Sequence, residues 1–219
     1  MTAPRPVREA PVRGVVFDLD GTLVDGYEGI AAGVNAARAA FALPALSADD
    51  VRGRVGLGLT HLMDDVVGPE HAAEGVRIFR EVYDRVCEDQ TRAVPGLNEL
   101  LEALRARGVR MSIASNKPAT YTHRIVERLG VAPYFDAVHG PETAGALKPD
   151  PAMIEACLRA MGVSREEALY VGDMPLDAEA GARAGVEVVL VAGGSASPDA
   201  LQATGRLVLD SLAALPELM

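Results

Sequence analysis

Apolar residues along this chain follow two alternating patterns, short continuous runs and longer stretches with helical spacing. The continuous runs predict buried strands at 15–18, 109–115, 135–138, 169–171 and 186–191, with a weaker edge strand at 207–209. The stretches between them predict helices, including 97–107 and 119–129, each followed by a glycine. Such an alternation of strand and helix favours a parallel sheet with helices on both faces.

The alternation is interrupted between the first two predicted strands, because residues 27–91 contain no convincing strand and have helical patterns throughout. Ser47 and Asp50 have the spacing of a capped helix start. We therefore expect a smaller helical domain at 26–93, inserted into a core domain formed by 1–25 and 94–219. Both connections contain glycine, which is typical of a hinge.

Composition and charge exclude several classes of partner. The chain is 49% apolar and 24% charged, which is typical of soluble globular proteins, and no apolar run is long enough to span a membrane. Residues 1–13 lack the apolar centre of a signal peptide and are predicted to be a short disordered lead. The net charge of −10 argues against nucleic-acid or anionic-membrane binding. We expect a cytoplasmic monomer or homodimer with Cys87 and Cys157 reduced.

The segment Asp18-Leu19-Asp20-Gly21-Thr22 directly follows the first apolar run. Two carboxylates at the end of a buried strand repel one another unless a cation lies between them. Gly21 and Thr22 are expected to let the backbone turn and to aim N–H groups at an anion. Mg²⁺ together with a phosphate group would satisfy all of these groups, whereas the alternative is a strand end with capping aspartates.

Polar residues also follow the next three predicted strands, in the segments Ser115-Asn116-Lys117, Lys148-Pro149-Asp150 and Gly172-Asp173, with Asp177 four residues beyond Asp173. Each segment alone has an ordinary structural explanation, such as a helix cap, a surface lysine or a turn. Together, at the carboxyl ends of parallel strands, they predict one ligand site.

The choice of basic residues supports this interpretation. Of the 21 basic residues, only Lys117 and Lys148 are lysines. Both fall within these polar segments, which indicates positions where a compact ammonium fits and a planar guanidinium does not. The alternative is chance placement.

These four segments together resemble the haloacid dehalogenase (HAD) superfamily, from Val15 to about Val191. The resemblance implies an α/β fold, with a doubly wound, parallel-sheet (Rossmann-like) core and an inserted α-helical cap of the C1 type. Within the superfamily the chain is most similar to phosphoglycolate phosphatases, although Gly26 stands where those relatives more often have Ser or Thr.

Catalytic roles follow from the resemblance and from the chemistry of the residue types. Asp18 would be the nucleophile that forms an aspartyl-phosphate. Asp20 would protonate the leaving alcohol and then activate the hydrolytic water. Lys148 would offset charge on the phosphoryl group and on Asp18.

Binding roles are implied in the same way. The expected substrate- and phosphate-binding residues are Ser115, Asn116, Lys117, Gly21 and Thr22. The cofactor would be Mg²⁺, because the donors are hard oxygen atoms. The expected metal site consists of Asp18, Asp173 and the backbone carbonyl of Asp20, with Asp177 as a partial or indirect ligand.

The sequence therefore predicts a Mg²⁺-dependent phosphatase that hydrolyses a small phosphorylated metabolite, with 2-phosphoglycolate as the first choice. A sugar phosphomutase is the main alternative, disfavoured because Gly26 and Ile30 stand where those relatives carry Thr and His. A phospho-ligand-binding module without turnover would predict a damaged motif, and none is damaged. In the cap, Arg54 could pair with a substrate carboxylate, or could be a solvated residue at a helix end.

Overall fold

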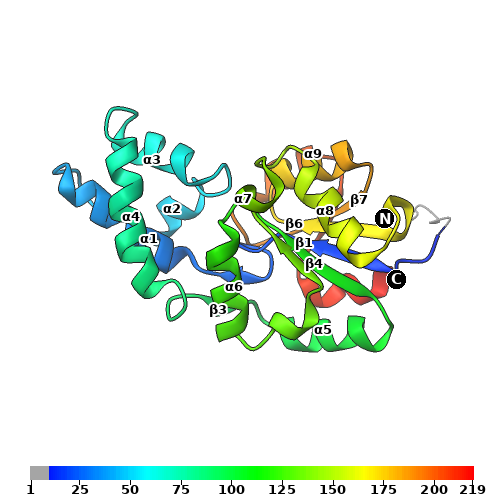
Figure 1. Cartoon of the computed structure of the whole chain (residues 1–219). Coiled ribbons are helices and arrows are strands. Elements are labelled where there is room, and N and C mark those ends of the chain that lie inside the picture. Colours follow the sequence, from blue (N-terminus) through cyan, green and yellow to red (C-terminus); the bar gives the residue numbers. More distant parts are fainter. Residues whose placement is uncertain (1–9) are drawn as a thin grey trace.

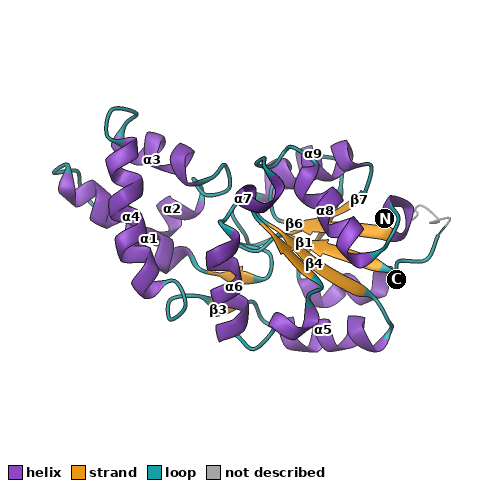
Figure 2. Cartoon of the chain, in the orientation of Figure 1, coloured by secondary structure: helices purple, strands orange, loops and turns teal. Residues whose placement is uncertain are grey.

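A computed structural model describes residues 10–219, and its centre is a six-stranded parallel sheet (Figure 2). The strand order is β5-β4-β1-β6-β7-β8. The strands, in sequence order, are β1 (Gly14–Phe17), β4 (Arg110–Ala114), β5 (Ala137–His139), β6 (Ala168–Gly172), β7 (Glu187–Val191) and β8 (Leu207–Leu209). The predicted parallel sheet and the edge position of the last strand are confirmed. The segment 1–9 of the predicted disordered lead lies outside the described residues.

Helices cover both faces of this sheet, as expected for a doubly wound fold. Alternate strand residues point to opposite faces, so Val15 and Phe17 of β1 join one apolar cluster and Val16 joins the other. The first cluster includes α5 (Leu97–Ala106), α6 (Ala119–Arg128) and the terminal 3₁₀ segment Leu212–Leu218. The second includes α8 (Ala152–Met161), α9 (Pro175–Ala184) and α10 (Pro198–Ala203).

Short elements complete the core. They are α7 (Pro141–Ala144) and the 3₁₀ turns Ala132–Tyr134 and Arg165–Glu167. Helix α8 begins at Ala152 with Pro151 as its capping residue, and the Asp150 side chain accepts a hydrogen bond from the Ala152 N–H.

The helices between β1 and α5 form a separate lobe beside the sheet (Figure 1). They are α1 (Tyr27–Ala40), α2 (Ala48–Arg52), α3 (Leu59–Val67) and α4 (Ala72–Val86). Ser47 and Asp50 form the predicted capping box at the start of α2. The apolar stripe of α4 packs against α1 in a third apolar cluster, which receives Tyr121 from α6. We call this lobe, residues 26–93, the cap.

The two connections to the cap pair with one another, which the sequence analysis did not predict. The strands β2 (Val24–Asp25) and β3 (Arg92–Ala93) form a two-residue antiparallel ribbon. Next to it, a Cβ atom on Gly26 would lie 2.9 Å from the Oγ1 atom of Thr91. The backbone at Gly26 is therefore packed closely against the returning connection.

Cys87 and Cys157 are both free and buried, so neither forms a disulfide. Within residues 10–219, none of the helices combines the length and the apolar character that crossing a bilayer requires.

Candidate active site

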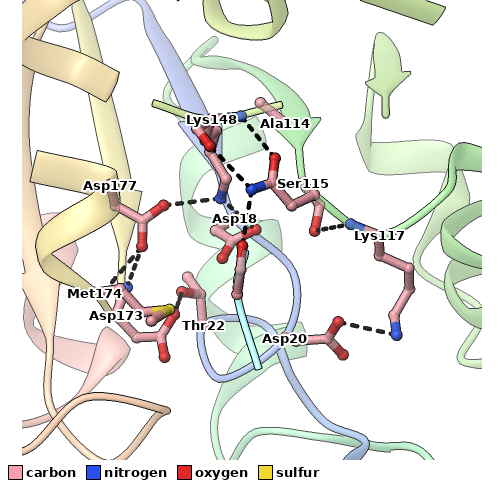
Figure 3. A network of polar contacts seen from close by, with 12 residues as sticks. Asp18, Asp20, Thr22, Ala114, Ser115, Lys117, Lys148, Asp173, Met174 and Asp177 are labelled. Atoms are coloured by element: carbon pink, nitrogen blue, oxygen red, sulfur yellow. Dashed lines mark hydrogen bonds and ion pairs between the residues drawn. The ribbon is translucent and has the colours of Figure 1, made fainter. Parts of the chain in front are cut away.

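The site lies at the carboxyl edge of the three central strands. Asp18 follows β1, Ser115 follows β4 and Asp173 follows β6. Because these strands are parallel neighbours, their ends meet, and all three side chains are buried there. The structure thus brings together the residues that the sequence placed on separate segments (Figure 3).

Lys148 enters the same place from the loop between α7 and α8. Its Nζ atom lies 2.9 Å from Asp18 Oδ1, 2.8 Å from Asp177 Oδ1 and 3.0 Å from the hydroxyl of Tyr170. Burial opposes the charge on this ammonium, but the carboxylates of Asp177 and Asp18 outweigh it and raise the pKa of Lys148 above its ordinary value. Lys148 is therefore a permanent cation beside Asp18.

One buried lysine does not balance the acidic groups around it. Burial raises the pKa of Asp18 to about 6, Lys148 opposes that shift, and Asp177 adds to it. Burial also raises the pKa of Asp173 well above its ordinary value, with further contributions from the charges of Asp177 and Asp18. The protein alone thus disfavours ionisation of both carboxyl groups, and a divalent cation would reverse this preference.

The arrangement of the acidic oxygens fits a Mg²⁺ ion. Asp18, Asp173 and Asp177 each offer an oxygen atom, and these three atoms lie within 4.8 Å of one another. Asp177 already accepts four hydrogen bonds, from Lys148, from Tyr170 and from the N–H groups of residues 173 and 174. These contacts use the lone pairs of Asp177, so Asp18 and Asp173 are better placed to contact a metal directly.

Asp20 lies on the other side of Asp18, toward the cap. Its Oδ2 atom lies 2.9 Å from the Nζ atom of Lys117, which also donates a hydrogen bond of 2.8 Å to the hydroxyl of Tyr83 on α4. Its Oδ1 atom is buried and accepts no hydrogen bond within residues 10–219. The chain Asp20–Lys117–Tyr83 therefore joins the core to the cap and leaves one oxygen of Asp20 available for a ligand.

Lys117 lines the cavity, and its ammonium is bound to these two partners, so its contact with substrate stays a prediction. The pKa of Lys117 is raised, since Asp20 and Tyr83 outweigh the opposing effect of burial. The helical pattern of residues 27–91 predicted a helix around Tyr83, but gave no signal that its hydroxyl would contact the core.

Ser115 and Asn116 both line the cavity beside Asp18, but their side chains make different contacts. The side chain of Asn116 bonds to the backbone: its Oδ1 accepts from Lys148 N at 2.7 Å and its Nδ2 donates to Gly56 O in the cap at 2.8 Å. Asn116 thus positions Lys148 and the cap loop, rather than pointing an unpaired amide at a substrate.

The expectation that Gly21 and Thr22 aim N–H groups at an anion is wrong in this structure. The Gly21 N–H donates to Val24 O, and the Thr22 N–H donates to Leu19 O, so both are used inside the turn. Gly21 has a φ of 81°, and a Cβ atom there would lie 2.4 Å from an oxygen of Asp173. The Thr22 hydroxyl lies 3.3 Å from the other oxygen of Asp173, so this turn positions the carboxylate of Asp173.

Arg54 lies outside the cavity, on the surface of the cap, where it forms an ion pair with Asp65. This geometry corresponds to the alternative of a solvated arginine. A neighbouring residue that the sequence analysis missed, Arg52, makes the contact with the core instead. It stacks over the ring of Tyr27 at 4.2 Å and donates a hydrogen bond of 3.0 Å to Gly193 O.

A cavity covers the site between the sheet edge and the cap. Asp18, Asp20, Ser115 and Lys148 form its floor. The cap contributes Ile30, Val55, Gly56, Gly58, Leu59, Leu62, Phe79 and Tyr83. A ligand bound to Asp18 would therefore meet polar groups at the floor of the cavity and mainly apolar groups of the cap.

Comparison with known proteins agrees with this arrangement. Residues 15–191 match the family described as haloacid dehalogenase-like hydrolase. The phosphoglycolate phosphatase of Aquifex aeolicus (strain VF5) is 34% identical over 82% of this chain and 84% of its own length. That of Chromobacterium violaceum is 31% identical over 95% of this chain and 96% of its own length.

Solved structures share the fold. A predicted phosphoglycolate phosphatase from Haemophilus somnus has a TM-score of 0.85 at 25% identity, over 94% of this chain and 97% of its own. A predicted phosphatase from Clostridium acetobutylicum has a TM-score of 0.86 at 24% identity, over 95% of this chain and 98% of its own. With the family match spanning most of the described residues, this chain belongs to the haloacid dehalogenase-like hydrolase family.

Proposed function

We propose that this protein is a Mg²⁺-dependent phosphatase that hydrolyses a small phosphate monoester, with 2-phosphoglycolate as the first substrate to test. The observation that carries the proposal is the buried group of Asp18, Asp20, Lys148 and Asp173 at one sheet edge. The curated relatives named phosphoglycolate phosphatase supply the choice of substrate.

Catalysis begins with attack by an oxygen of Asp18 on phosphorus. The Asp18–phosphorus bond forms as the bond from phosphorus to the leaving oxygen breaks, and Asp20 gives its proton to that oxygen. Asp20 then removes a proton from a water molecule that attacks phosphorus, which breaks the aspartyl-phosphate bond and releases inorganic phosphate. The position of Asp20, beside Asp18 and with one buried oxygen unpaired, supports this double role.

Three other groups would hold the phosphoryl oxygens and their charge. Lys148 supplies a fixed positive charge 2.9 Å from Asp18, and the hydroxyl of Ser115 lines the same floor. Mg²⁺, held by Asp18, Asp173 and the Asp20 carbonyl, would supply further positive charge for the developing negative charge. The acidic residues alone would repel an anionic substrate, so both cations are required.

The division into a core and a cap at 26–93 is part of this proposal, with the cap closing over the phosphoryl group and excluding bulk water. The separate apolar cluster of the cap supports the division. The two buried free thiols support a reaction in the cytoplasm. Ile30 supports a phosphatase over a phosphomutase, because it gives the cavity an apolar side chain where a mutase-like chain would have histidine.

The test is phosphate release from 2-phosphoglycolate by the purified protein, with Mg²⁺ and with EDTA. We expect the wild type to turn over in Mg²⁺ and not in EDTA. We expect no turnover by the Asp18→Asn variant. Intact-mass measurement after an acid quench of wild-type turnover should reveal a covalent phosphoryl adduct that Asp18→Asn lacks. Phosphate release by Asp18→Asn at more than a trace of the wild-type rate would overturn the assignment of the nucleophile.

A further inference from the structure

The side of the cavity formed by the cap differs chemically from its floor. Among the described residues that line the cavity, those from the cap carry no charged group. Their single polar side-chain group is the hydroxyl of Tyr83, which accepts a hydrogen bond from Lys117. The side chains of Val55 and Leu59 are only half-buried, so they retain apolar surface that a ligand can cover.

The core extends this apolar surface. Met174 and Leu176, which follow β6, also line the cavity and are half-buried. The ring of Tyr121 lines it from α6. The space between the polar floor of the cavity and the cap is therefore bounded by apolar side chains of both the cap and the core.

The cations near this region already have partners. Lys117 contacts Asp20 and Tyr83, and Lys148 contacts Asp18 and Asp177. Arg54, which the sequence suggested as a carboxylate ligand, lies outside the cavity. A charged leaving group would have to compete for these lysines, whereas an apolar leaving group would meet matching surface without breaking an ion pair.

We propose that the site also hydrolyses phosphate monoesters whose leaving group carries an apolar chain of several carbon atoms, and that its kcat/KM for such esters rises with the length of the chain. This inference rests on the proposed phosphatase function and specifies the substrate class of the same site. The phosphoryl group binds the polar floor, and the alkyl or aryl part contacts Val55, Leu59 and Met174.

A series of n-alkyl phosphates, from ethyl to hexyl, tests the proposal, because the leaving alcohols have similar reactivity and differ mainly in apolar length. Each methylene that leaves water contributes about fourfold to binding. We expect kcat/KM, measured with Mg²⁺ by phosphate release, to rise about fourfold per methylene for several carbons and then to level off. 2-Phosphoglycolate is assayed beside the series.

Variants at residues that line the cavity show where the rise in kcat/KM originates. Leu59→Asn should reduce the rise to about twofold per methylene or less. Val55→Thr nearly preserves side-chain shape and should act in the same direction, which guards against misfolding of Leu59→Asn. Leu57→Asn is the matched control, because Leu57 lies between Val55 and Leu59 in the sequence, is 44% exposed and does not line this cavity.

The outcomes separate this inference from the proposed function. A flat or falling series, with 2-phosphoglycolate hydrolysed efficiently, would overturn the apolar preference and leave the phosphatase intact. A rise that is equal in wild type, Leu59→Asn and Val55→Thr would also overturn it, because the cap wall would not be its source. No phosphate release from any ester would overturn the phosphatase itself.

Discussion

Replacing Asp18 by asparagine should stabilise the metal-free protein, and the gain should grow with pH. Burial raises the pKa of this carboxyl from 3.8 to about 6, so the folded protein holds the proton more tightly than the unfolded chain. Stability from this group is therefore lost as the pH rises from 3.8 through about 6, and stays lost above that range. The full penalty is about 3 kcal/mol at pH 8, and about 1 kcal/mol at pH 4.5.

Asparagine keeps the shape of Asp18 and removes this penalty, because it carries no charge. Lys148 stays paired in the variant, because Asp177 and Tyr170 remain its partners. In EDTA, the variant should melt about 6–12 °C above wild type at pH 8, and only a few degrees above it at pH 4.5. Thermal unfolding followed by circular dichroism measures both differences.

Asp210→Asn, at an exposed aspartate outside the site, is the control, and its melting temperature should stay close to wild type at both pH values. An equal gain for Asp18→Asn at both pH values would refute the reasoning, because it would not follow ionisation. A loss of stability at pH 8 would show that the Asp18–Lys148 pair stabilises the fold more than burial of the carboxylate destabilises it.

Other perturbations test the remaining contacts of the site. Stabilisation of the wild type by Mg²⁺, read as a shift in melting temperature, should weaken as the pH falls below about 6, because protons compete at Asp18, whose pKa is raised to that value; a shift independent of pH would contradict direct coordination by Asp18. Lys148→Arg should lower kcat by at least tenfold, since a guanidinium does not fit between the groups around this ammonium; an unchanged kcat would contradict that argument. Tyr83→Phe removes the acceptor of the Lys117 hydrogen bond and should lower the free energy of unfolding by about 1–2 kcal/mol, measured with urea. Little change in this free energy would mean that the cap is open in solution, without the contact between Lys117 and Tyr83. Gly26→Ala would press on Thr91, and should change kcat and KM together if the cap moves about this point; steady-state kinetics that match wild type would mean that the hinge lies elsewhere.

The fold was predictable from the sequence to within a few residues because its strands are continuous apolar runs. Both faces of β1 are buried, so Val15, Val16 and Phe17 are all apolar, and the run identifies a central strand directly. The β2–β3 ribbon could not be predicted in this way, since two residues on each strand carry no periodic signal. Its pairing depends on the two connections meeting in space.

The site was predictable where strand ends determine it. The βα alternation implies a parallel sheet with its carboxyl ends at one edge, and Asp18 and Asp173 converge there because β1 and β6 are neighbours. The roles of Gly21 and Asn116 were not predictable, since a backbone N–H or a side-chain amide can face a ligand or a nearby carbonyl, and only tertiary packing decides. Arg54 illustrates the same limit, because its partner Asp65 is eleven residues away in the cap.

The scarcity of lysine was informative for a geometric reason. Around Lys148, three oxygen-bearing groups surround one nitrogen atom at 2.8–3.0 Å, and an ammonium can direct one N–H toward each. A guanidinium is planar and larger, and it pairs best with a single carboxylate side by side, as Arg110 does with Asp136 on the surface. In a chain that uses arginine for its other 19 basic positions, both lysine side chains are enclosed and paired with a carboxylate, which suits a compact ammonium. The rare residue type therefore located the enclosed part of the site before any contact was known.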